Sequence, residues 1–267
     1  MSFHSRIFKV GEIDLHVYDN GVDADNLIVI FPPGIDDGRF VNILDLKDVF
    51  EDKRVIAITY PSRRKSARLE GFDSIYNINL ILREVIIQIL REKSYKKIYL
   101  AGFSFGSMTL TRLLQQGWNI LPTDSEIKLV LVNAGEFFGG LRKKIIKIAL
   151  RPALKHKRYA QFWKYSALGL FKSFDPLDFP DDRLQDIGEQ MIDILDYNID
   201  TEKQIPFKTY ILLGSKDGII DKASLDKLDQ VYTDDEYVIY DGGHIQSYGD
   251  SKEYKLIEED LARLFTC

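Results

Sequence analysis

The sequence contains a single cysteine, Cys267, and only four histidines among 267 residues. One cysteine excludes a scaffold of disulfide bonds within the chain. The histidines, at positions 4, 16, 156 and 244, are too scattered to form the His/Cys clusters that bind zinc. We therefore expect no metal site, and nothing else in the sequence indicates a cofactor.

Long hydrophobic runs and a secretory signal are also missing. The most apolar stretch, residues 78–90, is interrupted by Asn79, Arg83, Glu84 and Gln88. It is shorter than the roughly 20 apolar residues that a membrane-spanning helix needs. The first residues lack the apolar core of a signal peptide. These absences predict a cytoplasmic protein.

What is present is typical of a packed globular protein. Hydrophobic residues make up 45% of the chain and aromatic residues 12%, which excludes intrinsic disorder. The length suits one large α/β domain, with or without an insertion. The formal net charge is −5, from 36 basic and 41 acidic residues.

Short apolar runs alternate with segments of helical periodicity, a pattern typical of βα units around a mostly parallel sheet. The first two runs, separated by Gly11 and Glu12, predict a hairpin at the sheet edge. The predicted strands are Ile7–Val10, Ile13–Tyr18, Leu27–Phe31, Val55–Tyr60, Lys97–Ala101, Ile127–Asn133, Phe207–Gly214 and Tyr237–Tyr240. Helices are predicted over about 38–50, 74–93, 105–116, 221–230 and 251–265.

The alternation is interrupted once, between Asn133 and Phe207, where helix-forming and aromatic residues replace the strand signals. Ile145 and Ile148 lie on one face of a helix whose other face is basic, and Pro152 is expected to stop or kink that helix. We interpret residues 137–200 as a helical cap inserted into a core formed by residues 1–136 and 201–267.

Ser104 lies in the sequence Gly102-Phe103-Ser104-Phe105-Gly106, directly between an apolar strand and an amphipathic helix. This context is that of a nucleophile elbow, a strained turn that exposes a serine. Glycine is needed two residues before and after the serine, because a Cβ there would collide with the neighbouring helix or strand. Ser104 is therefore the candidate nucleophile, with a simple Gly-Ser turn as the alternative.

A serine nucleophile needs a base, and the base needs a carboxylate that fixes its tautomer. His244 is the only histidine predicted at the carboxyl edge of the sheet, where Ser104 also lies. Asp217 follows the seventh predicted strand at this edge and is the preferred carboxylate. Asp221 is expected at a helix N-cap, and Asp241 is only three residues before His244, so both are less favoured.

The order of Ser104, Asp217 and His244 along the chain resembles that of the α/β-hydrolase superfamily. The resemblance covers most of the chain outside residues 137–200. It implies an α/β-hydrolase fold with a mostly parallel, eight-stranded sheet flanked by helices and a helical cap over the active site. It also implies hydrolysis in two steps through an acyl-enzyme intermediate.

The same resemblance implies an oxyanion hole, formed partly by the loop after the third strand, where His-Gly is the usual sequence. This chain has Pro32 and Pro33 there, and neither has an N–H group to donate. The donor must then come from Gly34 or Ile35, and alignment on the glycine favours Ile35. The second expected donor is the N–H of Phe105, the residue after the nucleophile.

Charge is distributed unevenly along the chain. Residues 137–174 contain ten basic residues and no acidic ones, and a second basic cluster consists of Arg63, Arg64, Lys65 and Arg68. The other 22 basic residues stand against all 41 acidic ones, a formal charge of −19. Both basic segments are expected near the mouth of the active site. They form either an ordinary solvated surface or a site that attracts an anionic partner.

The sequence thus predicts a serine hydrolase that cleaves a carboxylic ester of a medium-sized, largely apolar molecule. One alternative is a thioesterase acting on acyl chains of an acidic acyl-carrier protein, and another is hydrolysis of a C–C bond. A ligand-binding protein without catalysis is the alternative from another class. The basic cap would suit an acyl-carrier protein, an acidic substrate or an anionic membrane surface met by the helix around 141–151. No nucleic-acid-binding motif is present.

Overall fold

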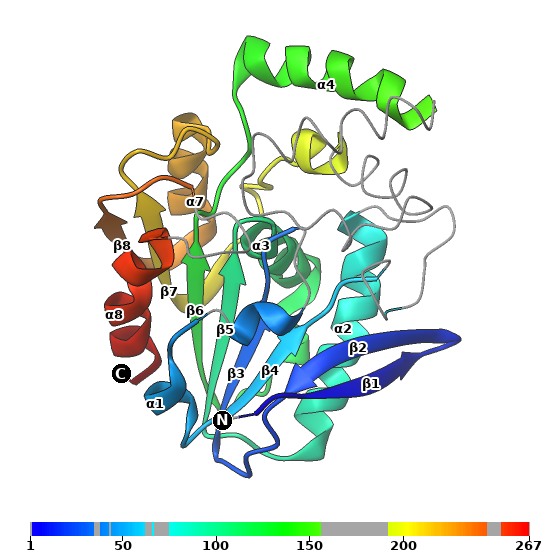
Figure 1. Ribbon diagram of the computed structural model, residues 1–267, viewed down its shortest axis with the longest axis vertical. Helices are drawn as coiled ribbons and strands as arrows, with labels where there is room; N and C mark the ends of the chain where they lie inside the picture. Colours follow the sequence, from blue (N-terminus) through cyan, green and yellow to red (C-terminus); the bar gives the residue numbers. More distant parts are fainter. Residues whose placement is uncertain are drawn as a thin grey trace.

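A computed structural model describes residues 2–34, 38–42, 44–61, 66, 75–155, 192–244 and 252–266. An eight-stranded sheet lies at its centre, in the order β1-β2-β4-β3-β5-β6-β7-β8 (Figure 1). Strand β2 pairs antiparallel with β1 and β4, and the other neighbours pair in parallel. The strands are β1 (His4–Val10), β2 (Ile13–Asp19), β3 (Asn26–Phe31), β4 (Arg54–Ile58), β5 (Lys97–Phe103), β6 (Glu126–Val132), β7 (Ile205–Gly214) and β8 (Tyr232–Tyr240). The predicted hairpin and the mostly parallel sheet are confirmed.

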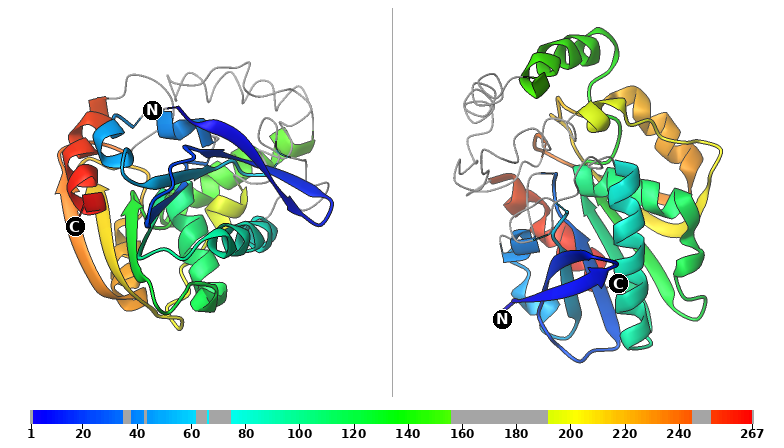
Figure 2. Two further views of the ribbon diagram at one scale, coloured as in Figure 1. Left: turned by 90° about the horizontal axis from the view of Figure 1, so that it is seen from below. Right: turned by 90° about the vertical axis from the view of Figure 1, so that its right-hand side faces the viewer.

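Helices cover both faces of the sheet, as the alternation of side chains along β3 requires (Figure 2). Leu27, Val29 and Phe31 pack on one side with α2 (Ile75–Glu92), α3 (Phe105–Gly117) and α7 (Leu225–Val231). Ile28 and Ile30 pack on the other side with α1 (Lys47–Phe50), α8 (Lys252–Thr266) and the 3-10 turn η1 (Gly38–Asn42). Both faces of β3 are therefore apolar, which is typical of a strand in the middle of a parallel sheet.

Two predicted boundaries are wrong for physical reasons. The segment 38–50 forms the separate turns η1 and α1, and the Gly38 N–H at the start of η1 donates to Thr59 Oγ1, just after β4, at 2.9 Å. Strand β8 begins at Tyr232 and not at Tyr237, since the intervening acidic residues pair with β7 while facing solvent. The exposed end of a strand has no hydrophobic pattern that would reveal it.

The predicted cap is described in part. Helix α4 (Gly140–Lys155) and a short helix at residues 192–196 lie within it, whereas residues 156–191 are outside the described part. Helix α4 continues past Pro152, so of the two expected effects of this proline the stop does not occur, and the kink stays a prediction. The division into core and cap stays a prediction. Among the described residues, no helix combines the length and the apolar character needed to cross a membrane.

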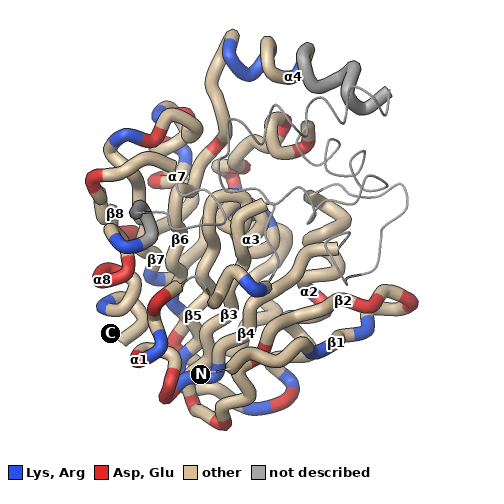
Figure 3. Tube along the Cα trace, in the orientation of Figure 1, with Lys and Arg blue, Asp and Glu red and all other residues tan. Residues whose placement is uncertain are grey.

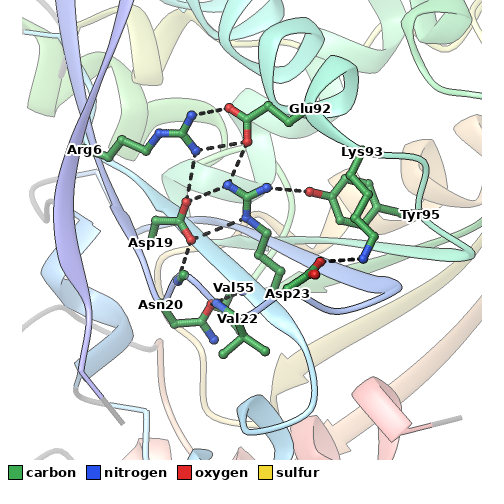
Figure 4. A network of polar contacts seen from close by, with 11 residues as sticks. Arg6, Asp19, Asn20, Val22, Asp23, Val55, Glu92, Lys93 and Tyr95 are labelled. Carbon is green, nitrogen blue, oxygen red and sulfur yellow. Dashed lines mark hydrogen bonds and ion pairs between the residues drawn. The ribbon is translucent and has the colours of Figure 1, made fainter.

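At the amino end of the parallel strands, far from their carboxyl edge, charged side chains connect four elements (Figure 4). The Arg54 guanidinium lies 2.8 Å from both the Asp19 and Glu92 carboxylates, and Arg6 also donates to both. Burial raises the pKa of Asp19 and Glu92, but the hydrogen bonds from the two arginines outweigh burial and hold both pKa values below their ordinary range. The network joins β1, β2, β4 and the end of α2.

Candidate active site

Ser104 lies at the turn between β5 and α3, with φ 52° and ψ −112°. This backbone region is unfavourable for a residue with a side chain. A Cβ at Gly102 would lie 2.6 Å from Ser107 Cα in α3, and one at Gly106 would lie 2.0 Å from Phe31 O in β3. Both glycines therefore allow α3 to start immediately after the serine, at the carboxyl edge of the sheet.

The structure brings Ser104, His244 and Asp217 together, although 140 residues separate the first two. Ser104 Oγ lies 2.7 Å from His244 Nε2, and His244 Nδ1 lies 2.7 Å from Asp217 Oδ2. An ionised carboxylate can only accept, so Nδ1 carries the proton and Nε2 is free to accept from the serine hydroxyl. All three side chains are buried, and the Phe137 ring packs perpendicular to the His244 ring, with the ring centroids 5.4 Å apart.

The Asp217 carboxylate is held by four donors. The N–H groups of Ile219 and Ile220 donate to Oδ1 at 2.8 and 3.1 Å. His244 and the Asn133 side chain donate to Oδ2. Burial raises the pKa of Asp217, but the hydrogen bond and charge of His244 and the two backbone donors outweigh it, so the pKa lies below its ordinary value. The group therefore stays ionised beside the imidazole.

The two competing carboxylates lie elsewhere. Asp221 caps the turn η5 (Lys222–Ser224), where its side chain accepts from the Ala223 N–H at 3.3 Å. Asp241 is exposed and forms an ion pair with Lys216 at 2.7 Å. In the part of the chain that the structure describes, the carboxylate that contacts His244 Nδ1 is that of Asp217.

The two segments expected to form the oxyanion hole are adjacent. A Cβ at Gly34 would lie 2.9 Å from Phe105 Cβ, so the loop after β3 runs close to the residue that follows the nucleophile. The Pro32 carbonyl accepts from the Tyr60 hydroxyl at 2.9 Å, which fixes the start of that loop. Ile35 lies outside the described residues. The assignment of Ile35 and Phe105 as donors stays a prediction.

The sequence analysis missed Asn133, which follows β6 at the same edge of the sheet. Its Nδ2 donates to Asp217 Oδ2 at 2.8 Å, and the Tyr240 hydroxyl lies 3.0 Å from its Oδ1. The same hydroxyl donates to the carbonyl of Gly243 at 2.7 Å, next to His244. Asn133 is fully buried and has φ 50°, a conformation that asparagine tolerates better than most residues. In the sequence, the feature that could have indicated Asn133 is a polar residue at the end of an apolar strand.

We expect the substitution Asn133→Gly to lower kcat about tenfold and to leave KM within about twofold. Glycine keeps the positive φ, so the variant removes the amide that orients Asp217 without straining the backbone. Steady-state kinetics with a small ester measures both constants. The matched control is Asn119→Gly, an exposed asparagine at the other end of α3. Equal kcat values for the wild type and Asn133→Gly would contradict a positioning role.

Within the described parts of the chain, no group of three or more His, Cys, Asp or Glu side chains could hold a metal ion. The arrangement instead offers a hydroxyl, a base and a buried carboxylate in one line, which is the geometry of nucleophilic catalysis by serine.

The Serine hydrolase (FSH1) family model matches residues 62–246. The chain belongs to this family. The matched range includes the elbow, the Asp217 turn and His244. As a serine hydrolase of this family, the protein is an α/β-hydrolase enzyme. No curated protein matches the sequence.

Solved structures support the same fold over the whole chain. A thioesterase domain from the curacin biosynthetic pathway has a TM-score of 0.68 at 15% identity, covering 100% of both chains. An esterase from Exiguobacterium antarcticum has a TM-score of 0.69 at 17% identity and covers 100% of this chain and 99% of its own. The 2-hydroxy-6-oxo-6-phenylhexa-2,4-dienoate hydrolase from Rhodococcus sp. strain RHA1 has a TM-score of 0.66 at 15% identity, with the same coverage. At these identities the likeness concerns the fold alone.

Proposed function

We propose that this hydrolase cleaves a carboxylic ester of a medium-sized, largely apolar molecule through an acyl-enzyme intermediate. The observation that carries the proposal is the line from Asp217 through His244 to Ser104, with 2.7 Å at each step, on a strained elbow. A serine hydroxyl becomes a nucleophile only when a base takes its proton, and His244 Nε2 is in hydrogen-bonding range.

In the first step, Ser104 Oγ attacks the ester carbonyl carbon while its proton moves to His244 Nε2. The carbonyl oxygen becomes an oxyanion, for which the N–H groups of Phe105 and Ile35 are the proposed donors. The C–O bond to the leaving group then breaks, and His244 gives its proton to the departing alkoxide, so an alcohol leaves and Ser104 is acylated.

In the second step, a water molecule attacks the acyl carbon while His244 takes one of its protons. The bond to Ser104 Oγ breaks, the serine recovers the proton from His244, and the carboxylic acid leaves. Asp217 stays ionised throughout and stabilises the imidazolium that forms in each step, in keeping with its lowered pKa.

A thioesterase acting on carrier-bound acyl chains is the second candidate. It is favoured by helix α4, which contains six basic and no acidic residues and lies at the same end of the molecule as the carboxyl edge of the sheet (Figure 1). Acyl esters and acyl thioesters of matched, graded length distinguish the two candidates by their kcat/KM values. No contact among the described residues favours C–C bond hydrolysis.

The proposal is tested with a fluorophosphonate probe and intact-mass measurement. We expect one adduct per chain, located on Ser104 by peptide mapping, because the probe reacts with an activated serine and not with an ordinary hydroxyl. The control is Ser215→Ala, an exposed serine near the same edge, which should label like the wild type. Absence of labelling, or an adduct on another residue, would favour a ligand-binding protein without serine catalysis.

A further inference from the structure

Helix α4 presents aliphatic side chains to solvent. Leu141, Ile145 and Ile148 are 72%, 57% and 66% exposed. They are spaced four and three residues apart, so they lie on one face of the helix. Single exposed aliphatic residues are common, but three in a row on one helix form a continuous apolar stripe.

The other side of α4 contacts the rest of the protein, so the apolar stripe faces outward. Ile146 packs against the hydrophobic core, and Lys147 forms an ion pair with Asp196. Arg142 lies 4.5 Å above the Phe138 ring and donates to the Gly218 carbonyl at 2.7 Å. Gly218 follows Asp217, so the start of α4 lies next to the turn that carries the carboxylate partner of His244.

The charge of α4 indicates what can cover the stripe. The helix contains six basic residues, Arg142, Lys143, Lys144, Lys147, Arg151 and Lys155, and no acidic ones. In the coloured part of α4, Figure 3 shows basic residues and no acidic ones. Lys144 is exposed and, at 100° per residue, lies at the border of the stripe beside Leu141 and Ile148. A second copy of the chain would bring two such helices together and their like charges would repel. The occupant must accept aliphatic side chains and also carry negative charge.

An anionic lipid surface meets both requirements. A helix with an apolar stripe and basic borders lies in the plane of the interface, with the stripe among the acyl chains and the lysines among the headgroups. At 16 residues α4 is shorter than a spanning helix. We propose that α4 docks the enzyme on an anionic lipid surface through Leu141, Ile145 and Ile148, with Lys144 at the headgroups. This goes beyond the proposed ester hydrolysis and does not depend on it.

The test is co-sedimentation with vesicles of phosphatidylcholine containing about 30% phosphatidylglycerol, compared with pure phosphatidylcholine. The protein carries Ser104→Ala, so binding is measured without turnover. We expect binding to the anionic vesicles and little to the neutral ones. The triple variant Leu141→Asp, Ile145→Asp, Ile148→Asp should bind at least tenfold more weakly, and Lys144→Gln about fivefold more weakly, as expected for one charge near the surface.

The matched control is Ile239→Asp, which changes an isoleucine on β8 whose side chain is 61% exposed and which does not belong to α4. This variant should bind the anionic vesicles as tightly as the parent protein does. Thermal melts identify any variant that fails to fold. If the triple variant does not fold, Lys144→Gln, which changes one surface side chain, still tests whether the charge of α4 contributes to binding. Three results would overturn the proposal: no binding of the parent protein to anionic vesicles, equal binding to neutral ones, or equal binding of a folded triple variant. A dimer that the triple variant abolishes would assign the stripe to a second copy and would also overturn it.

Discussion

Replacing Ser104 with alanine should lower kcat for any ester that the protein hydrolyses by about 10⁴-fold or more. The variant keeps His244, Asp217 and the predicted oxyanion donors but has no hydroxyl to form the acyl-enzyme, so only slow attack by water remains. The fold should be unaffected, because the Ser104 side chain does not cap helix α3 and its hydroxyl is hydrogen-bonded to His244, at the site itself.

Two measurements check this expectation together. Initial rates with an ester should fall to the background level, and the circular dichroism melt should agree with that of the wild type. Ser215→Ala, outside the proposed machinery, should keep full activity. If Ser104→Ala retained more than a few per cent of the wild-type rate, Ser104 could not be the nucleophile.

The second large effect is expected for Asp217→Asn, which should lower kcat by about 10⁴-fold. The amide oxygen can still accept from the N–H groups of Ile219 and Ile220, so the turn is kept. The amide nitrogen would then face His244 Nδ1–H and the Asn133 Nδ2 group, which are both donors. The imidazole would change tautomer and lose the lone pair that takes the serine proton.

The controls for Asp217 are the two aspartates that the sequence offered as competitors. Asp221→Asn keeps an oxygen for the Ala223 N–H, and Asp241→Asn removes only an exposed ion pair with Lys216. Both variants should retain activity within about twofold, because an exposed ion pair contributes little. If Asp241→Asn lowered kcat as much as Asp217→Asn does, Asp241 and not Asp217 would be the carboxylate that acts on His244. Rates at one saturating ester concentration suffice for the comparison.

The sequence was sufficient to predict the fold because each strand of the sheet has its own local pattern. Strand β3 is apolar on both faces, and the hairpin β1–β2 is marked by Gly11 at its turn. The elbow was predictable for the same reason, since Gly102 and Gly106 are needed by a turn within five residues. Family membership adds the activity of a hydrolase but not its substrate.

What the sequence could not predict depends on contacts between distant segments. Asn133 acts on Asp217, which is 84 residues away, and its side chain has no pattern of its own. The start of β8 was missed because Asp234 and its neighbours are strand residues by virtue of pairing with β7. The oxyanion donors depend on how the loop after Pro33 lies against Phe105, which two prolines alone do not determine.

Strand β8 has a further consequence for how copies of the protein behave at high concentration. As the last strand of the sheet, it has one edge of backbone N–H and C=O groups that no strand of the sheet pairs with. Asp234, Asp235 and Glu236 follow one another along it, and burial and the neighbouring Asp229 charge raise the pKa of Asp235. Repulsion between these carboxylates opposes edge-to-edge pairing of two sheets. Because its pKa is raised, Asp235 loses its charge at a higher pH than an ordinary aspartate, so mild acidification weakens this protection against edge-to-edge pairing.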